Sequence, residues 1–163
     1  PHPRIVNVNS MMGTVALPSL GAYSMSKHAL TAMSDVLRLE LAPRGVHVAE
    51  VQPGAVSTPL TDRMAGDLQA VYDRADDTGQ RADYMGLIAA MQAVLRQQQT
   101  NAVSADDVAD AIVKAVITPR PKPRYVIGGA ARGLMLMRRF APDSIGDMIL
   151  RRVLKLPGYP KNR

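Results

Sequence analysis

Two runs of strand-forming residues flank a long helix-forming stretch, and this order constrains the fold more than any other feature. Residues 4–10, RIVNVNS, mix β-branched and polar residues with the alternation of a strand. Residues 22–42 contain neither proline nor glycine and predict a helix. Residues 46–52, VHVAEVQ, predict a second strand that ends at Pro53 and Gly54. A strand, a helix and a strand in this order predict a crossover between two parallel strands.

The rest of the chain predicts further helices and one more strand. Residues 57–80 are polar and rich in Asp, so we expect a mobile loop with short helical pieces there. A helix is then expected over residues 82–98, and a clearer one over residues 104–118. Residues 124–129 predict a third strand closed by glycines, and residues 131–155 predict an amphipathic pair of helices.

Composition limits the classes of protein to consider. The chain has 163 residues, of which 47% are hydrophobic, so one domain with a real core is expected. It contains no cysteine and three histidines, which argues against a disulfide framework and a structural zinc site, and we predict no metal ligands. No charge-free apolar run approaches the roughly 18 residues of a membrane span, and the first residues do not resemble a signal peptide. We therefore expect a soluble, cytoplasmic protein.

Basic residues gather in the last part of the chain. The formal charge is +6, and residues 119–163 hold eleven Lys or Arg against two Asp. Two interpretations stay open: a solvated basic helix face, or weak contact with an acidic membrane surface. We expect no nucleic-acid partner.

Tyr23 and Lys27 carry the clearest chemical signal. They lie four positions apart in the predicted helix, so their side chains leave the same face. A phenol has a pKa of about 10, and a nearby ammonium lowers it, which would make Tyr23 a usable acid or base. Ser10 ends the first predicted strand, where open parallel sheets place groups that contact ligands, and its hydroxyl could hold a substrate oxygen. His28 points about 100° away from Lys27, which favours a packing or interface role.

Taken together, these motifs resemble those of the short-chain dehydrogenase/reductase family. The match is specific over residues 4–60 and weaker over the rest of the chain. It is carried by IVNVNS with Ser10, by GAYSMSKHAL with Tyr23 and Lys27, and by VQPGAVSTPL with Pro53, Gly54 and Thr58.

The resemblance implies a fold and a reaction. The fold is α/β, the C-terminal part of a doubly wound parallel sheet of the Rossmann type. The reaction is the NAD(P)-dependent interconversion of an alcohol and a ketone or aldehyde by hydride transfer. By resemblance, Tyr23 is the proton donor or acceptor, Lys27 lowers its pKa and binds the nicotinamide ribose, and Ser10 orients the substrate oxygen.

The same resemblance implies a set of residues that bind the cofactor. The main chain after the second strand and the Thr58 hydroxyl would contact the nicotinamide carboxamide, while the Pro-Gly pair shapes the turn. The whole predicted cofactor-binding set is Tyr23, Lys27, Pro53, Gly54, Ala55, Val56 and Thr58.

The family's pattern is only partly present. No Gly-rich turn that would seat a pyrophosphate precedes Ser10, and the residue that selects NAD or NADP is missing, so the cofactor stays open between the two. The helix that carries the family's catalytic asparagine is also absent, and Asn7 and Asn9 lie on the wrong element to replace it. We interpret the chain as a catalytic C-terminal portion without the cofactor cradle, inactive alone.

This interpretation divides the chain into two parts. Residues 1–130 form the C-terminal portion of one Rossmann-like domain, and residues 131–163 form a basic amphipathic extension. Within the first part we expect a catalytic strand-helix-strand unit over 4–54, a substrate loop over 57–100, and a last helix and strand over 104–129.

Fewer residues support our predictions of the substrate, the partner and the alternative function. Met11, Met12 and Leu17 lie between Ser10 and Tyr23 and slightly favour an apolar alcohol or carbonyl substrate, although methionines also fill cores. The resemblance implies a homodimer or homotetramer formed through the long helix. The alternative is a non-catalytic remnant that acts as a dimerising or interaction subunit.

Overall fold

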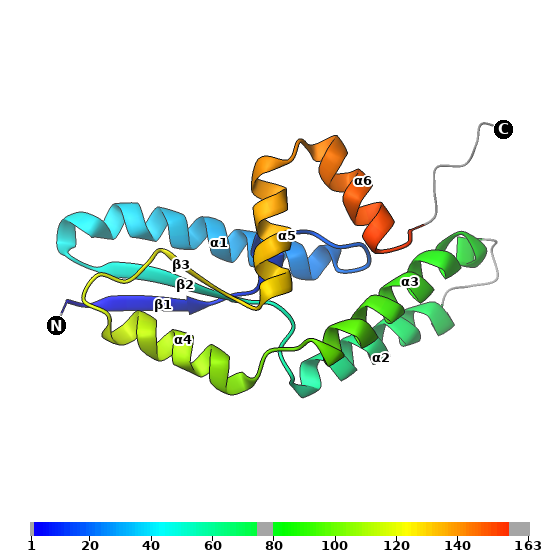
Figure 1. Cartoon of the computed structure of the whole chain (residues 1–163), viewed down its shortest axis with the longest axis horizontal. Helices are drawn as coiled ribbons and strands as arrows, with labels where there is room; N and C mark the ends of the chain where they lie inside the picture. The colour runs from blue at the N-terminus through cyan, green and yellow to red at the C-terminus, as the bar shows by residue number, and fades with distance from the viewer. Residues whose placement is uncertain (1, 75–79, 157–163) are drawn as a thin grey trace.

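The computed structural model describes residues 2–74 and 80–156. Figure 1 shows the arrangement of its strands and helices. In chain order these are β1 (Arg4–Val8), α1 (Gly21–Leu41), β2 (His47–Pro53), α2 (Pro59–Arg74), α3 (Gln80–Thr100), α4 (Ala105–Ile117), β3 (Arg124–Ile127), α5 (Gly129–Phe140) and α6 (Asp143–Val153), with two short 3-10 turns, η1 (Met11–Gly13) and η2 (Ala42–Arg44).

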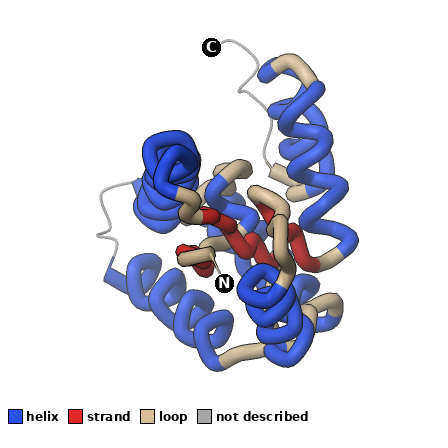
Figure 2. The backbone as a smooth tube through the Cα atoms, turned by 90° about the vertical axis from the view of Figure 1, so that its left-hand side faces the viewer, coloured by secondary structure: helices blue, strands red, loops and turns tan. Residues whose placement is uncertain are grey.

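A three-stranded parallel sheet forms the centre of the molecule, in the order β1-β2-β3. Ile5 pairs with Val48, and Val51 pairs with Tyr125, so β2 has a partner on each side. Helix α1 covers one face of the sheet and α4 the other (Figures 1 and 2). The α/β class and the predicted parallel crossover are confirmed.

The apolar core continues from the sheet into the loop after β1. Its buried cluster joins this loop to α3, α5 and the residue that follows α6. The cluster consists of Met11, Met12, Val15, Leu17, Met91, Ala131, Met135 and Leu154. These methionines therefore fill the core, which is one of the two roles expected for them. The C-terminal helices, expected as an extension, pack on the loop between Ser10 and Tyr23.

The prediction of a loop over residues 57–80 was wrong for Pro59–Arg74, which form helix α2, and residues 75–79 lie outside the described residues. Helices α2 and α3 lie side by side (Figure 1), and Gln92 Nε2 donates a hydrogen bond to Gln69 Oε1 at 2.7 Å. Polar and acidic residues are tolerated on the solvent side of a helix whose other side packs on a neighbour. The helix expected over residues 82–98 is confirmed and is longer than predicted.

Helix α1 is not covered on most of its faces by this chain. Its only buried residues are Ser24 and Ser34, so the side against the sheet carries small polar groups. Several large apolar side chains are exposed instead. They are Met25, Met33, Val36 and Leu39, with exposures of 69%, 46%, 50% and 74%.

In the described part of the chain, no helix is both long enough and apolar enough to cross a bilayer. The expected cellular compartment stays a prediction.

The η1 turn lies close to α1 at Gly13, and we predict that Gly13→Ala destabilises the fold. An added Cβ would lie 2.7 Å from Asn9 Nδ2 and 3.0 Å from the Lys27 carbonyl oxygen, and closer still to Thr31 Oγ1. Overpacking of this kind lowers the free energy of unfolding by about 1–3 kcal/mol, measurable by urea denaturation.

Gly21→Ala is the matched control, since nothing lies within 4 Å of a Cβ added there. We expect it to leave stability unchanged or to raise it by up to about 1 kcal/mol, because alanine favours a helix. Equal losses in the two variants would contradict the tight contact at Gly13.

Candidate functional site

The residues predicted to act on a substrate gather where the strands end. Ser10 lies two residues after β1, and the Pro-Gly pair closes β2. Tyr23 and Lys27 occupy the first two turns of α1, which begins after the loop that follows Ser10. Because α1 runs back along the sheet, its first turns lie at the carboxyl ends of the strands (Figure 1).

Tyr23 and Lys27 contact each other, as their spacing predicts. The Lys27 Nζ lies 5.5 Å from the centre of the Tyr23 ring. Tyr23 is half-buried and packs against the apolar cluster, whereas Lys27 reaches over its ring. His28 points elsewhere, and its Nδ1 donates to the Ser24 carbonyl oxygen at 2.9 Å.

Ser10 is held against the same apolar cluster as Tyr23. Its residue is 8% exposed, and its Oγ accepts a hydrogen bond from the Met12 main-chain N–H at 3.2 Å. Met11 and Met12 belong to the cluster on which Tyr23 packs, which brings the serine and tyrosine to one region. Among the described residues the Ser10 hydroxyl has no acceptor for its proton, so that proton is available to a ligand.

Among the described residues, the N–H and the C=O of Val56, just after β2, have no hydrogen-bond partner. The Val103 N–H donates to the Ala55 carbonyl at 2.9 Å, and the Ser57 N–H donates to the Val103 carbonyl at 3.0 Å. In this parallel bridge the N–H and C=O of Val56 point away from Val103. A donor next to an acceptor matches a carboxamide. Thr58 is exposed just before α2.

Gly54 fits the turn and also has a role that the sequence did not indicate. Its N–H donates to the Ile127 carbonyl at 3.0 Å, which joins the end of β2 to β3. A Cβ added at Gly54 would lie 3.1 Å from the Ala131 Cβ. The missing side chain therefore leaves room for the first turn of α5.

A polar network missed by the sequence reasoning holds α1 against the sheet. At its centre is Glu50 of β2, which is 1% exposed. Asn9 Nδ2 donates to Glu50 Oε1, to Thr31 Oγ1 at 2.9 Å and to the Lys27 carbonyl at 3.0 Å. Thr31 also donates to Glu50 Oε1 at 2.9 Å. The network thus contacts the main chain of Lys27 itself.

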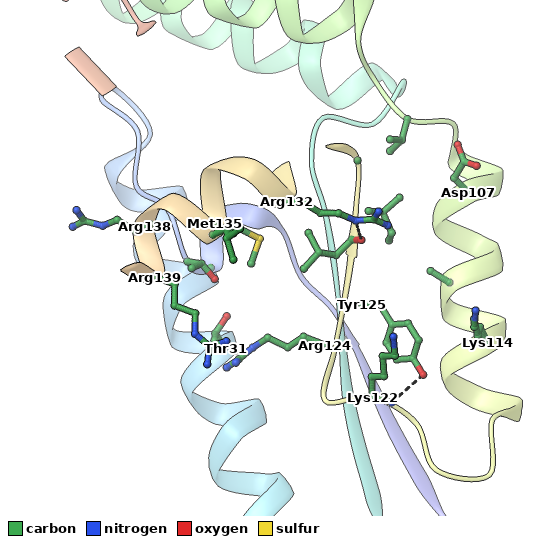
Figure 3. A pocket seen from close by; sticks show the side chains of 18 of the residues that line it. Thr31, Asp107, Lys114, Lys122, Arg124, Tyr125, Arg132, Met135, Arg138 and Arg139 are labelled. Carbon is green, nitrogen blue, oxygen red and sulfur yellow. Dashed lines mark hydrogen bonds between the residues drawn. The ribbon is translucent and has the colours of Figure 1, made fainter. Parts of the chain in front are cut away.

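The network reaches β3 through Arg124. Its Nε lies 3.4 Å from Glu50 Oε2, and its Nη2 lies 2.5 Å from Asp35 Oδ2 on α1. In the close-up of Figure 3, Arg124 extends toward Thr31. Partial burial would raise the pKa of Asp35, but hydrogen bonds and charge attraction from Arg38 and Arg124 outweigh it and hold that pKa below its ordinary value.

A signal for this network was present in the strands. Asn7 and Asn9 alternate in and after β1, as Glu50 and Gln52 do in β2, so all four face the same side of the sheet. The sequence reasoning considered the asparagines only as substitutes for a catalytic residue. The asparagines instead join the sheet to α1, where Asn7 Nδ2 donates to Ser34 Oγ at 2.9 Å.

Comparisons with known proteins point to one family. A family model described as short chain dehydrogenase matches residues 2–69. The 3-amino-tetrahydro-pyrrolizinone reductase of Xenorhabdus hominickii is 33% identical over 129 residues, which cover 79% of this chain and 45% of the relative. Human retinol dehydrogenase 5 is 32% identical over 159 residues, covering 94% of this chain and 49% of the relative. The chain spans about half the length of these curated relatives.

A solved structure shows the same fold. It is a short chain dehydrogenase/reductase from Burkholderia phymatum in complex with NAD, with a TM-score of 0.62 and 22% sequence identity. The match covers 100% of this chain and 52% of that one.

We predict that Asp35→Asn weakens the dependence of stability on acid pH. Between the ordinary carboxyl pKa and the lowered pKa of folded Asp35, the unfolded chain binds a proton that the folded chain does not. The free energy of unfolding therefore falls as the pH drops through this range. Urea unfolding at pH about 5 and about 3 should show a smaller loss in the variant than in the parent.

Asp110→Asn, a change at an exposed position on α4, serves as the control. Its free energy of unfolding should fall with pH as much as that of the parent. An Asp35→Asn variant with the parent's acid dependence would show that the arginines do not hold this carboxylate ionised.

Proposed function

We propose, since the chain belongs to the short-chain dehydrogenase/reductase family, that it carries the proton-transfer part of an NAD(P)-dependent oxidoreductase site. The reaction interconverts an alcohol and a ketone or aldehyde. The observation that carries this proposal is the contact between Tyr23 and Lys27 at the ends of the strands, beside the apolar cluster that begins at Met11, the residue after Ser10.

Each side chain has a role that suits its surroundings. In reduction, Tyr23 donates its phenolic proton to the carbonyl oxygen of the substrate, and in oxidation it accepts the proton of the alcohol. Lys27 stabilises the phenolate that remains after donation, because its ammonium lies over the ring. Ser10 donates a hydrogen bond to the same substrate oxygen and so fixes its position.

A nicotinamide cofactor, NAD or NADP, would supply or accept the hydride. The described residues fit its carboxamide, since the N–H and C=O of Val56 are directed away from their neighbouring segment. Thr58 adds a hydroxyl beside them, and Lys27 would hydrogen-bond the ribose. Pro53 and Gly54 keep this segment in place through β3.

The substrate we propose is apolar. Met11, Met12 and Leu17 follow Ser10 in the chain and are buried in the apolar cluster on which Tyr23 packs, so a substrate that reaches Ser10 and Tyr23 lies beside apolar surroundings. The human relative is named for retinol, an apolar alcohol, which agrees with this class.

We also propose that the protein is a homodimer or homotetramer that packs through α1. Five of its exposed apolar residues follow one stripe with alternating spacings of four and three, which is the pattern of helices that pack on each other. The stripe consists of Met25, Ala29, Ala32, Val36 and Leu39.

Replacing the phenolic oxygen tests the proposed reaction. In the intact protein as the cell makes it, Tyr23→Phe should lower kcat by about 100-fold to 10,000-fold, because general acid-base catalysis has this size. Binding of NADH or NADPH, followed by cofactor fluorescence, should stay close to that of the parent.

Tyr84→Phe, at an exposed position on α3, is the control and should keep full turnover. Unchanged turnover in Tyr23→Phe would rule out the assignment. A parent protein that binds the cofactor but turns over no alcohol or ketone would favour a non-catalytic interaction subunit.

A charge in the α1 stripe tests the proposed oligomer. Leu39→Glu places a carboxylate at a side chain that is 74% exposed in this chain, so it should dissociate the oligomer without unfolding it. Light scattering coupled to size-exclusion chromatography gives the mass of the particle. Ile117→Glu on α4, where the side chain is 70% exposed, should leave the mass unchanged. If Leu39→Glu keeps the parent's mass, α1 is not the interface.

A further inference from the structure

A large open cavity lies beside β3, and neither Ser10 nor Tyr23 lines it. Its volume is about 1420 Å³, and residues 124–128, which are β3 and the glycine after it, all line it. Side chains of α1, α4 and α5 complete the lining. Because β3 is the last strand in the order β1-β2-β3, the cavity follows an edge of the described sheet.

The outer edge of β3 presents main-chain groups to this cavity. The Pro123 and Ile127 carbonyls accept hydrogen bonds from N–H groups of β2 and of the glycine after it, at 2.9 and 3.0 Å. Since every second residue of a parallel strand bonds to the same neighbour, the N–H and C=O of Arg124 and Val126 are directed away from β2. The Val126 carbonyl accepts from Arg132 Nε at 3.1 Å. Two N–H groups and one carbonyl therefore stay available along the edge, as far as the described residues extend.

Basic side chains flank this edge on both faces of the sheet. On the face that α1 covers, the Arg139 side chain extends from α5 toward Thr31 and Arg124 (Figure 3). On the opposite face lies α4, which carries Lys114 (Figure 3). Lys122, just before β3, lines the same cavity. A strand added at this edge would therefore meet positive charge on each of its faces.

This positive charge is only partly compensated. Within the described chain, six Lys or Arg line the cavity against Asp107 and Asp110. Arg124 and Arg138 have carboxylate partners, whereas the other four basic residues are exposed and have no ion pair within the described ranges. These four are Lys114, Lys122, Arg132 and Arg139. The cavity thus favours an acidic occupant.

We propose that the edge of β3 binds an extended acidic peptide of a partner protein, which adds to the sheet as a further strand. The peptide accepts hydrogen bonds from the Arg124 and Val126 N–H groups and donates one to the Arg124 carbonyl. Its side chains point alternately to the two faces of the sheet, so acidic residues on either face meet the basic residues there.

Other occupants match these groups less well. A small anion or a nucleic acid would suit the positive charge, but it would not pair with donors and acceptors spaced as in a strand. Two copies of this chain would bring two positively charged edges together, and like charges repel. The proposal does not depend on the oxidoreductase assignment, because its readout is peptide binding and not turnover.

Fluorescence anisotropy of a labelled peptide tests this proposal on the intact protein. The probe repeats Asp-Glu-Val-Thr over about twelve residues, so that each face of the extended peptide carries acids. We expect it to bind in about 0.05 M salt and about tenfold more weakly in about 0.5 M salt. The same peptide with methylated main-chain nitrogens should also bind about tenfold more weakly, because it donates no hydrogen bond.

Changes in the cavity should weaken binding of the unmethylated probe. Arg139→Gln and Lys114→Gln each remove one cation, from opposite faces, and should each weaken binding about fivefold. Val126→Pro removes an N–H from the outer edge and leaves the hydrogen bonds to β2, so it should weaken binding about tenfold.

Matched charge changes outside the cavity are the controls. Arg44→Gln and Arg152→Gln each remove an exposed cation that does not line the cavity. Both should bind the probe as the parent does, and thermal unfolding checks that every variant is folded.

Three outcomes would overturn the proposal. They are no binding of the probe in low salt, equal binding of the methylated and unmethylated peptides, and cavity variants that bind as tightly as the parent. Absent peptide binding together with an oligomer that Val126→Pro dissociates would show instead that the edge of β3 joins two copies of the chain.

Discussion

A carboxylate buried in the central strand joins the parts of this fold. Glu50 is 1% exposed, and a buried charge costs several kcal/mol unless it is paired and hydrogen-bonded. Its partners come from three elements: Asn9 after β1, Thr31 on α1 and Arg124 on β3. Because each partner must keep its position to satisfy the charge, the rotation of α1 relative to the strands is fixed.

The geometry of the candidate site depends on this attachment of α1 to the sheet. Asn9, which satisfies Glu50, also donates to the carbonyl of Lys27, so the network positions the helix turn that carries the lysine. Tyr23 is one turn earlier and rests on the apolar cluster that α5 completes. The polar network thus orients the helix from the sheet side, and the C-terminal helices support the loop between Ser10 and Tyr23.

The sequence predicted local features well and non-local ones poorly. Alternation and helix-forming composition located β1, α1 and β2, and the four-residue spacing placed Tyr23 and Lys27 together. The sequence analysis missed helix α2, because its many polar residues indicate a helix only once its packing against α3 is known. The partnership of Glu50 with Arg124 joins residues 74 positions apart, and polar residues within a strand do not reveal their partners before the fold is known. The roles of the site residues remain predictions.

The most direct test of the proposed function follows the hydride itself. The intact protein is incubated with a ketone and with NADH or NADPH that carries deuterium at C4 of the nicotinamide, and the alcohol is analysed by mass spectrometry and NMR. We predict deuterium at the carbinol carbon, with the hydroxyl proton drawn from exchangeable hydrogen. An alcohol without deuterium at that carbon from either face-labelled cofactor, or no alcohol while the cofactor stays bound, would contradict the account.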